Sequence, residues 1–200
     1  CCVVFCFQAE DGIRGLVRSR GLGDVYKRQR LERIAQAAWA KGIKATVYNC
    51  PEIRTNSSDI FAGVELPLVG LLSALKKENG GAWAQAQWQA CGALLADGIT
   101  VDAMLAKVEA FHTSDVMRPF RNFAAWPMPN SADQADLTIG TSDEVQKMHK
   151  DPKALVTDLL SALVIEATGP LMFLESSAPS GPVLWLNHDI IARQLNQLHA

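Results

Sequence analysis

The sequence of 200 residues has neither a strong excess of charge nor a long apolar run. Nineteen Lys and Arg residues stand against 21 Asp and Glu residues, so the formal net charge at pH 7 is -2 and the isoelectric point is near 6.1. Nucleic acids and anionic membranes attract proteins with an excess of basic side chains, so we expect neither as a partner. No apolar run approaches the roughly 20 residues of a membrane-spanning helix, which also argues against a membrane partner.

Cysteine is scarce outside the first residues of the chain. Of the five cysteines, only Cys50 and Cys91 lie beyond residue 29. Two cysteines exclude a disulfide framework and a four-cysteine zinc site in that part, and they fit a reducing compartment. The histidines beyond residue 29 have no cysteine or carboxylate partner at a recognised metal-ligand spacing. We therefore predict no metal site and a cytoplasmic location.

The first 29 residues contain a different kind of pattern. Residues 8–14, read as codons, resemble the primer-site adapter that is ligated to DNA in high-throughput sequencing. Residues 19–29 resemble the end of a transposase-delivered adapter, and the four residues between the two blocks leave room for the usual index. Tags and fusion scars are excluded from fold reasoning. We therefore predict that residues 1–29 are a non-native, disordered leader, and that 30–200 are a single domain, the C-terminal fragment of a larger protein.

The remaining residues predict an α/β fold that is rich in helix, with a small, mostly parallel sheet and a helical insertion. The composition of the whole sequence, 48% hydrophobic and 20% charged residues, fits one globular domain with a real core. The spacing of apolar residues predicts helices over 30–40, 64–79, 82–96, 102–111 and 152–167, and one after Asn187. Alternating or continuous apolar runs predict strands over 44–49, 135–139, 171–174 and 183–186.

Polar residues follow three of the predicted strands. Ligands in parallel sheets gather at the carboxyl ends of strands, where helix N-termini converge. Such residues are Asn49, Cys50 and Glu52 after the first strand, Gly140, Thr141, Ser142 and Asp143 after the second, and Asn187, His188 and Asp189 after the last. We take Gly140, Thr141, Ser142 and Asn187 as ligand-binding candidates, with an anionic small molecule as the partner. A simple helix cap also explains Thr141, because Glu144 follows at capping-box spacing.

Three of these residues have side chains suited to catalysis. His188 and Asp189 have the chemistry of an acid/base pair, and Cys50 has that of a nucleophile. Simpler roles are a histidine and a favourable acid in the first turn of a helix, and a buried thiol in the core.

One segment resembles a known family. Residues 149–173 hold Glu-Ala-Thr-Gly-Pro-Leu-Met-Phe after a helix that opens with His-Lys-Asp-Pro. This is similar to the C-terminal Thr-Gly-Pro segment of sugar transferases that carry an Asp-x-Asp metal motif. No Asp-x-Asp and no Gly-Gly-x-Tyr stretch precedes it here, so no catalytic residue is carried over. The resemblance implies a transferase, and no other family is identified.

Two functions follow from these patterns. The first is the C-terminal part of a cytosolic α/β enzyme, a transferase by the resemblance, that binds an anionic small molecule at its strand ends. The second is a non-catalytic interaction or regulatory module that uses the helices of 64–111 and the Pro- and aromatic-rich loop 118–129 as a partner surface. The sequence indicates neither a cofactor nor an oligomeric state.

Overall fold

A computed structural model describes residues 3–8, 21–55, 63, 65–78, 81–121 and 131–200. Along the chain the elements are β1 (Val3–Gln8), α2 (Gly21–Ala40), β2 (Ala45–Cys50), α3 (Glu65–Lys77), α4 (Gly81–Leu94), α5 (Val101–Thr113), the 3-10 turn η2 (Arg118–Arg121), α6 (Ala132–Lys147), α7 (Val156–Ser177), β3 (Val183–Trp185) and α8 (His188–Leu198). The prediction of a helix-rich α/β fold with a small parallel sheet is confirmed.

The strand β2 lies at the centre of the sheet. Its strands follow the order β1-β2-β3 and run parallel, with Val3 opposite Ala45 and Val47 opposite Val183. All six residues of β2 are buried, as expected for a strand that is covered on both faces. The connection from β2 to β3 carries the helices α3 to α7, which is the predicted helical insertion.

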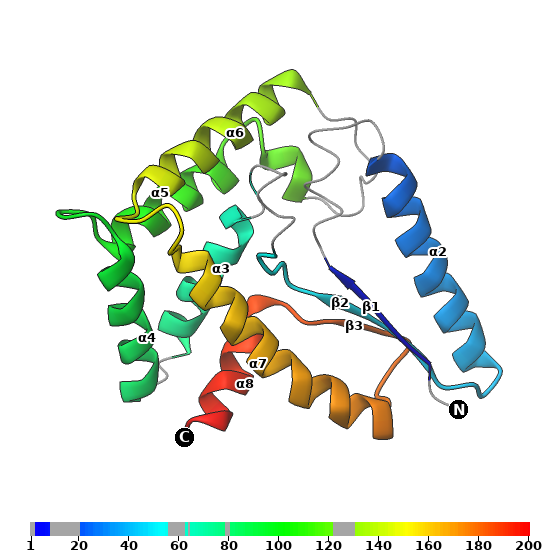
Figure 1. Cartoon of the computed structure of the whole chain (residues 1–200). Helices are drawn as coiled ribbons and strands as arrows, with labels where there is room; N and C mark the ends of the chain where they lie inside the picture. Colours follow the sequence, from blue (N-terminus) through cyan, green and yellow to red (C-terminus); the bar gives the residue numbers. More distant parts are fainter. Residues whose placement is uncertain (1–2, 9–20, 56–62, 64, 79–80, 122–130) are drawn as a thin grey trace.

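Helices cover the two faces of the sheet (Figure 1). On one face lies α2, where Ala35 is buried and the Trp39 indole donates a hydrogen bond of 2.7 Å to the Ala45 carbonyl. On the other face, Tyr48 and Cys50 join a hydrophobic core that includes side chains of α3, α7 and α8. Successive residues of a strand point to opposite faces, so β2 contributes to both layers.

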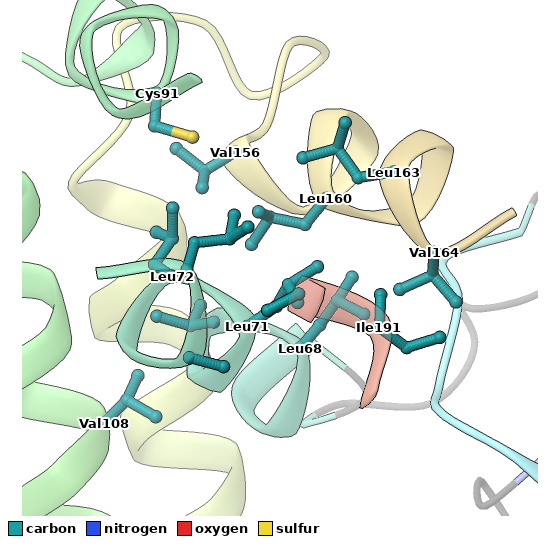
Figure 2. Packing of buried hydrophobic residues seen from close by; sticks show 14 of the residues in the cluster. Leu68, Leu71, Leu72, Cys91, Val108, Val156, Leu160, Leu163, Val164 and Ile191 are labelled. Carbon is teal, nitrogen blue, oxygen red and sulfur yellow. The ribbon is translucent and has the colours of Figure 1, made fainter. Parts of the chain in front are cut away.

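The core is centred on α3 (Figure 2). This helix is apolar around most of its circumference, which is typical of a helix surrounded by other elements. Leu68, Leu71 and Leu72 are fully buried and pack toward α7 and α8, where Leu160 and Ile191 are also fully buried. The helix α3 therefore packs against both the long helix α7 and the last helix α8, which also contact each other.

The predicted strand over 135–139 is wrong, because these residues lie inside α6. The short alternation Ala-Asp-Leu-Thr-Ile matched a strand, but the buried residues of α6 are Gln134, Thr138, Thr141, Ser142 and Val145, which follow the helical period. The helix begins at a capping box of Ser131 and Gln134, not at Thr141 and Glu144. A Ser-x-x-Gln signal was thus present in the sequence, ten residues before the predicted capping box of Thr141 and Glu144.

The predicted helix end at Thr168 is also wrong, and so is the strand over 171–174, because α7 continues through Pro170 to Ser177. A proline inside a helix loses one backbone hydrogen bond and costs about 3 kcal/mol. Leu171 and Met172 pack against the hydrophobic core, which favours continuation. Among the described residues, α7 is the one helix long and apolar enough to cross a membrane by length and composition, and its buried face belongs to the core.

Parts of the predicted disordered leader form regular structure. Residues 3–8 pair with β2 as β1, and residues 21–29 form the first half of α2. Val and Phe residues favour strands, and the free edge of a sheet offers unpaired backbone groups to such a segment. At the opposite edge lies β3, the strand predicted over 183–186, where Trp185 is 44% exposed.

We predict that Gly140→Ala stabilises the chain. Gly140 is an exposed residue inside α6, and a methyl group there would meet no atom within 4 Å. Alanine is favoured over glycine in a helix by about 1 kcal/mol, so the free energy of unfolding, measured with urea, should rise by that order. The control is Gly42→Ala, which also meets no atom but sits at a φ of 77° between α2 and β2 and should lower this free energy. Equal effects at the two sites would contradict the helical assignment of residue 140.

Candidate functional site

Two of the three predicted strand ends lie together at the carboxyl edge of the sheet. Asn49 of β2 pairs with Trp185 of β3, and the Leu186 amide donates a hydrogen bond of 2.9 Å to the Asn49 carbonyl. The polar residues after β2 and those before α8 are therefore neighbours. The third predicted group, Gly140 to Ser142, lies within α6, in a different part of the molecule (Figure 1). The strand-end argument for that group falls with the predicted strand.

Asn49 is the most enclosed polar residue of this edge. Its side chain is 4% exposed, and its amide nitrogen Nδ2 donates a hydrogen bond of 3.1 Å to Glu32 Oε1 of α2. The oxygen Oδ1 is buried and has no hydrogen-bond partner. Such an atom costs about 1–3 kcal/mol and is uncommon in native proteins unless it serves a ligand or water. Asn49 therefore offers one fixed acceptor at the end of the central strand.

The segment after β2 is held against the first two turns of α7. Pro51 and Glu52 are buried. The Arg54 backbone amide donates to Ser161 Oγ at 2.7 Å, and the Arg54 guanidinium pairs with Asp158 Oδ1 at 2.6 Å. The chain therefore leaves the sheet along a defined path, which we call the strand-end segment (residues 49–55).

His188 and Asp189 begin α8 beside this edge. The His188 ring packs on Gly70 of α3, where an added Cβ would stand 3.2 Å from Nδ1, and its Nε2 is buried without a hydrogen-bond partner. Burial lowers the pKa of His188 to about 4, opposed by the Asp189 carboxylate and aided by His112, so the ring is neutral at pH 7. Asp189 lies 3.9 Å from Lys77 Nζ.

Asn187, after which a helix was predicted, is the N-cap of α8. Its side-chain oxygen accepts a hydrogen bond of 3.1 Å from the Ile190 amide, so this acceptor is used inside the helix. Cys50 belongs to the hydrophobic core beside Tyr48. The catalytic assignments of Cys50, His188 and Asp189 stay predictions.

Sequence reasoning missed Ser161 and Asp158. Both are ordinary helix residues in the sequence, and their role becomes visible only when α7 is placed against the strand end, more than 100 positions away along the chain. A partial signal existed, because Asp158 three residues after Leu155 marks the start of a helix, where its Oδ2 accepts the Leu155 amide at 3.0 Å.

The fold places the chain in the class of α/β proteins with a parallel sheet, and in that class ligands commonly bind where the parallel strands end. A family model described as enoyl-acyl carrier protein reductase FabMG matches residues 23–195. The chain belongs to this family, the FabMG enoyl-acyl carrier protein reductases.

Two solved structures are similar to the chain. One is an apo structure of FabMG, a novel type of enoyl-acyl carrier protein reductase, with 70% sequence identity and a TM-score of 0.82 over 86% of this chain and 39% of that chain. The other is an NADH-bound structure of FabMG, with 64% identity and a TM-score of 0.71 over 86% of this chain and 41% of that one. The chain thus spans about two fifths of the length of these relatives. No curated protein matches the chain.

The family assignment corrects several predictions. The chain does have an identifiable family, and it is a family of oxidoreductases, so the similarity of 149–173 to sugar transferases does not indicate a transferase. The Thr-Gly-Pro motif behind that similarity is a stretch of the helix α7. The match also begins at residue 23, inside the predicted leader. The non-native origin of the residues before it stays a prediction.

The interaction module is overturned by the same finding. Its surface was to be formed by the helices of 64–111 and the loop 118–129. The described residues of α3, α4 and α5 include no large hydrophobic side chain that is exposed. Residues 122–129 of the loop lie outside the described residues.

We predict that His188 makes stability fall with acid. The pKa of His188 is about 4 in the folded chain, against 6.5 for an ordinary histidine, so the unfolded chain binds more protons between these values. The unfolding free energy should therefore drop between pH 6.5 and pH 4, by on the order of 3 kcal/mol from this residue. His149, whose pKa is also lowered by burial, acts in the same direction.

Urea unfolding of the His188→Leu chain over this pH range should show a shallower slope than that of the unmodified chain. Asp189→Asn is the matched variant, because it removes the carboxylate that favours the charged ring and should extend the loss to lower pH. An unchanged slope in His188→Leu would show that the ring titrates normally.

Proposed function

We propose that the chain forms part of the NADH site of an enoyl-acyl carrier protein reductase, with the strand-end segment contacting the cofactor. The observation that carries this proposal is the buried, unpartnered Asn49 Oδ1 at the carboxyl end of the central parallel strand. Dinucleotides bind outside the carboxyl ends of strands in open parallel sheets. The family and the NADH-bound relative supply the identity of the dinucleotide.

The residues present fit this cofactor. NADH carries hydroxyl and carboxamide groups that donate hydrogen bonds. Asn49 Oδ1 is an acceptor without a hydrogen-bond donor. The Glu32 contact at 3.1 Å holds the amide in one orientation, because Nδ2 must face the Glu32 carboxylate. Oδ1 is then fixed on the other side of the amide group. A preorganised acceptor binds a donor without losing side-chain entropy on binding.

The chemistry of the reaction places two demands on such a site. NADH, when bound, supplies a hydride to the carbon–carbon double bond of an enoyl group, and a proton completes the reduction. The residues of this chain would bind and orient the cofactor and keep water from its contacts with the strand end. Asn49, Cys50 and Glu52 are each no more than 9% exposed, and this enclosure would keep water from the contacts between the cofactor and the strand end.

The proposal refines the predicted partner and location. NADH is a small anionic molecule, which agrees with the predicted class of partner. We place the protein in the cytoplasm, since the apolar helix α7 uses its buried face for the core, and Cys50 and Cys91 are not joined in a disulfide.

We predict that Asn49→Ala weakens NADH binding roughly threefold to tenfold, the effect of one lost hydrogen bond. The measurement is a titration of the full chain that follows the fluorescence of NADH. Asn196→Ala is a matched control, because Asn196 of α8 also has a buried Oδ1 without a partner but lies near the far end of that helix.

The control should bind NADH as the unmodified chain does. Equal losses in both variants would point to a general loss of structure and would count against the site. If the unmodified chain did not bind NADH, the proposed function would be wrong for this chain.

A further inference from the structure

We propose that Ser161 and Asp158 of α7 are positioning residues for the cofactor, acting through the strand-end segment. This inference rests on the proposed function. Neither residue is adjacent to the sheet in sequence, and both reach the backbone or side chain of Arg54 across more than 100 positions. Their contacts fix where the segment runs after β2 ends, and so fix what it presents to NADH.

Ser161 is oriented by its own helix. Its side chain is 4% exposed, and its hydroxyl donates a hydrogen bond of 2.6 Å to the Thr157 carbonyl one turn earlier. The single hydroxyl proton is thereby used, so a lone pair of Oγ is free to accept the Arg54 amide at 2.7 Å. Ser161 Oγ is therefore a fixed acceptor for the backbone amide of Arg54, in the segment that follows β2.

Asp158 adds a charged contact from the same face of α7. Its Oδ1 pairs with the Arg54 guanidinium at 2.6 Å, while its Oδ2 accepts the Leu155 amide at the start of the helix. One carboxylate thus joins the first turn of α7 to the strand-end segment. The Asp158 side chain is 44% exposed, so the ion pair alone contributes little to the free energy of unfolding. Its effect is to hold the Arg54 side chain in a defined position against α7.

The start of α7 is itself fixed by His149, which follows α6. His149 Nε2 accepts a hydrogen bond of 3.1 Å from the Val156 amide, and Nδ1 lies 3.0 Å from the Val145 carbonyl. These two contacts require the neutral ring with its proton on Nδ1, and burial lowers the pKa of His149 in agreement. A continuous chain of contacts therefore runs from α6 through the first turns of α7 to Arg54. We call this chain of contacts the anchor.

The test compares Ser161→Ala with Thr168→Ala in the full chain. Thr168 is a matched control, because its hydroxyl also donates at 2.6 Å to the carbonyl four residues earlier in α7, but no contact with the strand end is involved. Two quantities are measured: the hydrogen-exchange protection of the Arg54 amide, and the dissociation constant for NADH. Ser161→Thr, which keeps the hydroxyl, serves as the rescue variant.

Ser161→Ala should lower the protection of the Arg54 amide at least tenfold and raise the dissociation constant for NADH about tenfold. Thr168→Ala should leave both unchanged, and Ser161→Thr should lie near the unmodified chain in both. An unchanged NADH affinity in Ser161→Ala, with normal binding by the unmodified chain, overturns the positioning role alone. Equal losses in Thr168→Ala overturn it as well, because a general weakening of α7 would then explain the result.

The two proposals fail in different ways. Absence of NADH binding by the unmodified chain overturns the proposed function, and the positioning role for NADH falls with it. In that case the hydrogen-exchange protection of the Arg54 amide still tests whether Ser161 holds the strand-end segment. Full protection of this amide in Ser161→Ala would show that the hydroxyl does not hold the segment.

Discussion

The parallel pairing of β2 with β3 is the constraint on which the rest of the structure depends. Parallel neighbours cannot be joined by a tight turn, so the chain must cross from one end of the sheet to the other between them. Here the crossing carries α3 to α7. The same pairing brings both strands to an end at one edge, where Asn49 stands beside the residues that start α8. Core and candidate site thus result from a single topological requirement.

The sequence was sufficient to predict those helices and strands that carry a single strong local signal. The run Ala-Thr-Val-Tyr-Asn predicts β2 through its β-branched and aromatic residues, and Asn187 predicts the start of α8 through its capping chemistry. Both strand ends could therefore be identified as candidate sites. Their proximity followed once the strands were parallel neighbours, which the sequence suggests but does not determine.

Errors arose where a local signal competed with tertiary packing. Five residues of α6 matched a strand period by chance, whereas the capping box at Ser131 and the burial of Thr138 and Val145 on one helical face mark a helix. The Thr-Gly-Pro motif is a strong local stop, yet α7 passes through it with Leu171 and Met172 against the core. The Ser161 contact could not be predicted, because no local pattern marks a serine that accepts a hydrogen bond from a residue 107 positions away.

The long crossover between the paired strands has a consequence for variation within the family. Val47 and Val183 are joined across 136 positions, so the pairing closes a very large loop. The entropy of loop closure grows only with the logarithm of length, about 0.6 kcal/mol for each doubling. Connections between the helices of the crossover are therefore free to lengthen or shorten at little thermodynamic cost. Relatives can remodel that side of the molecule while the strand ends, held by β2, β3 and the start of α7, keep their arrangement.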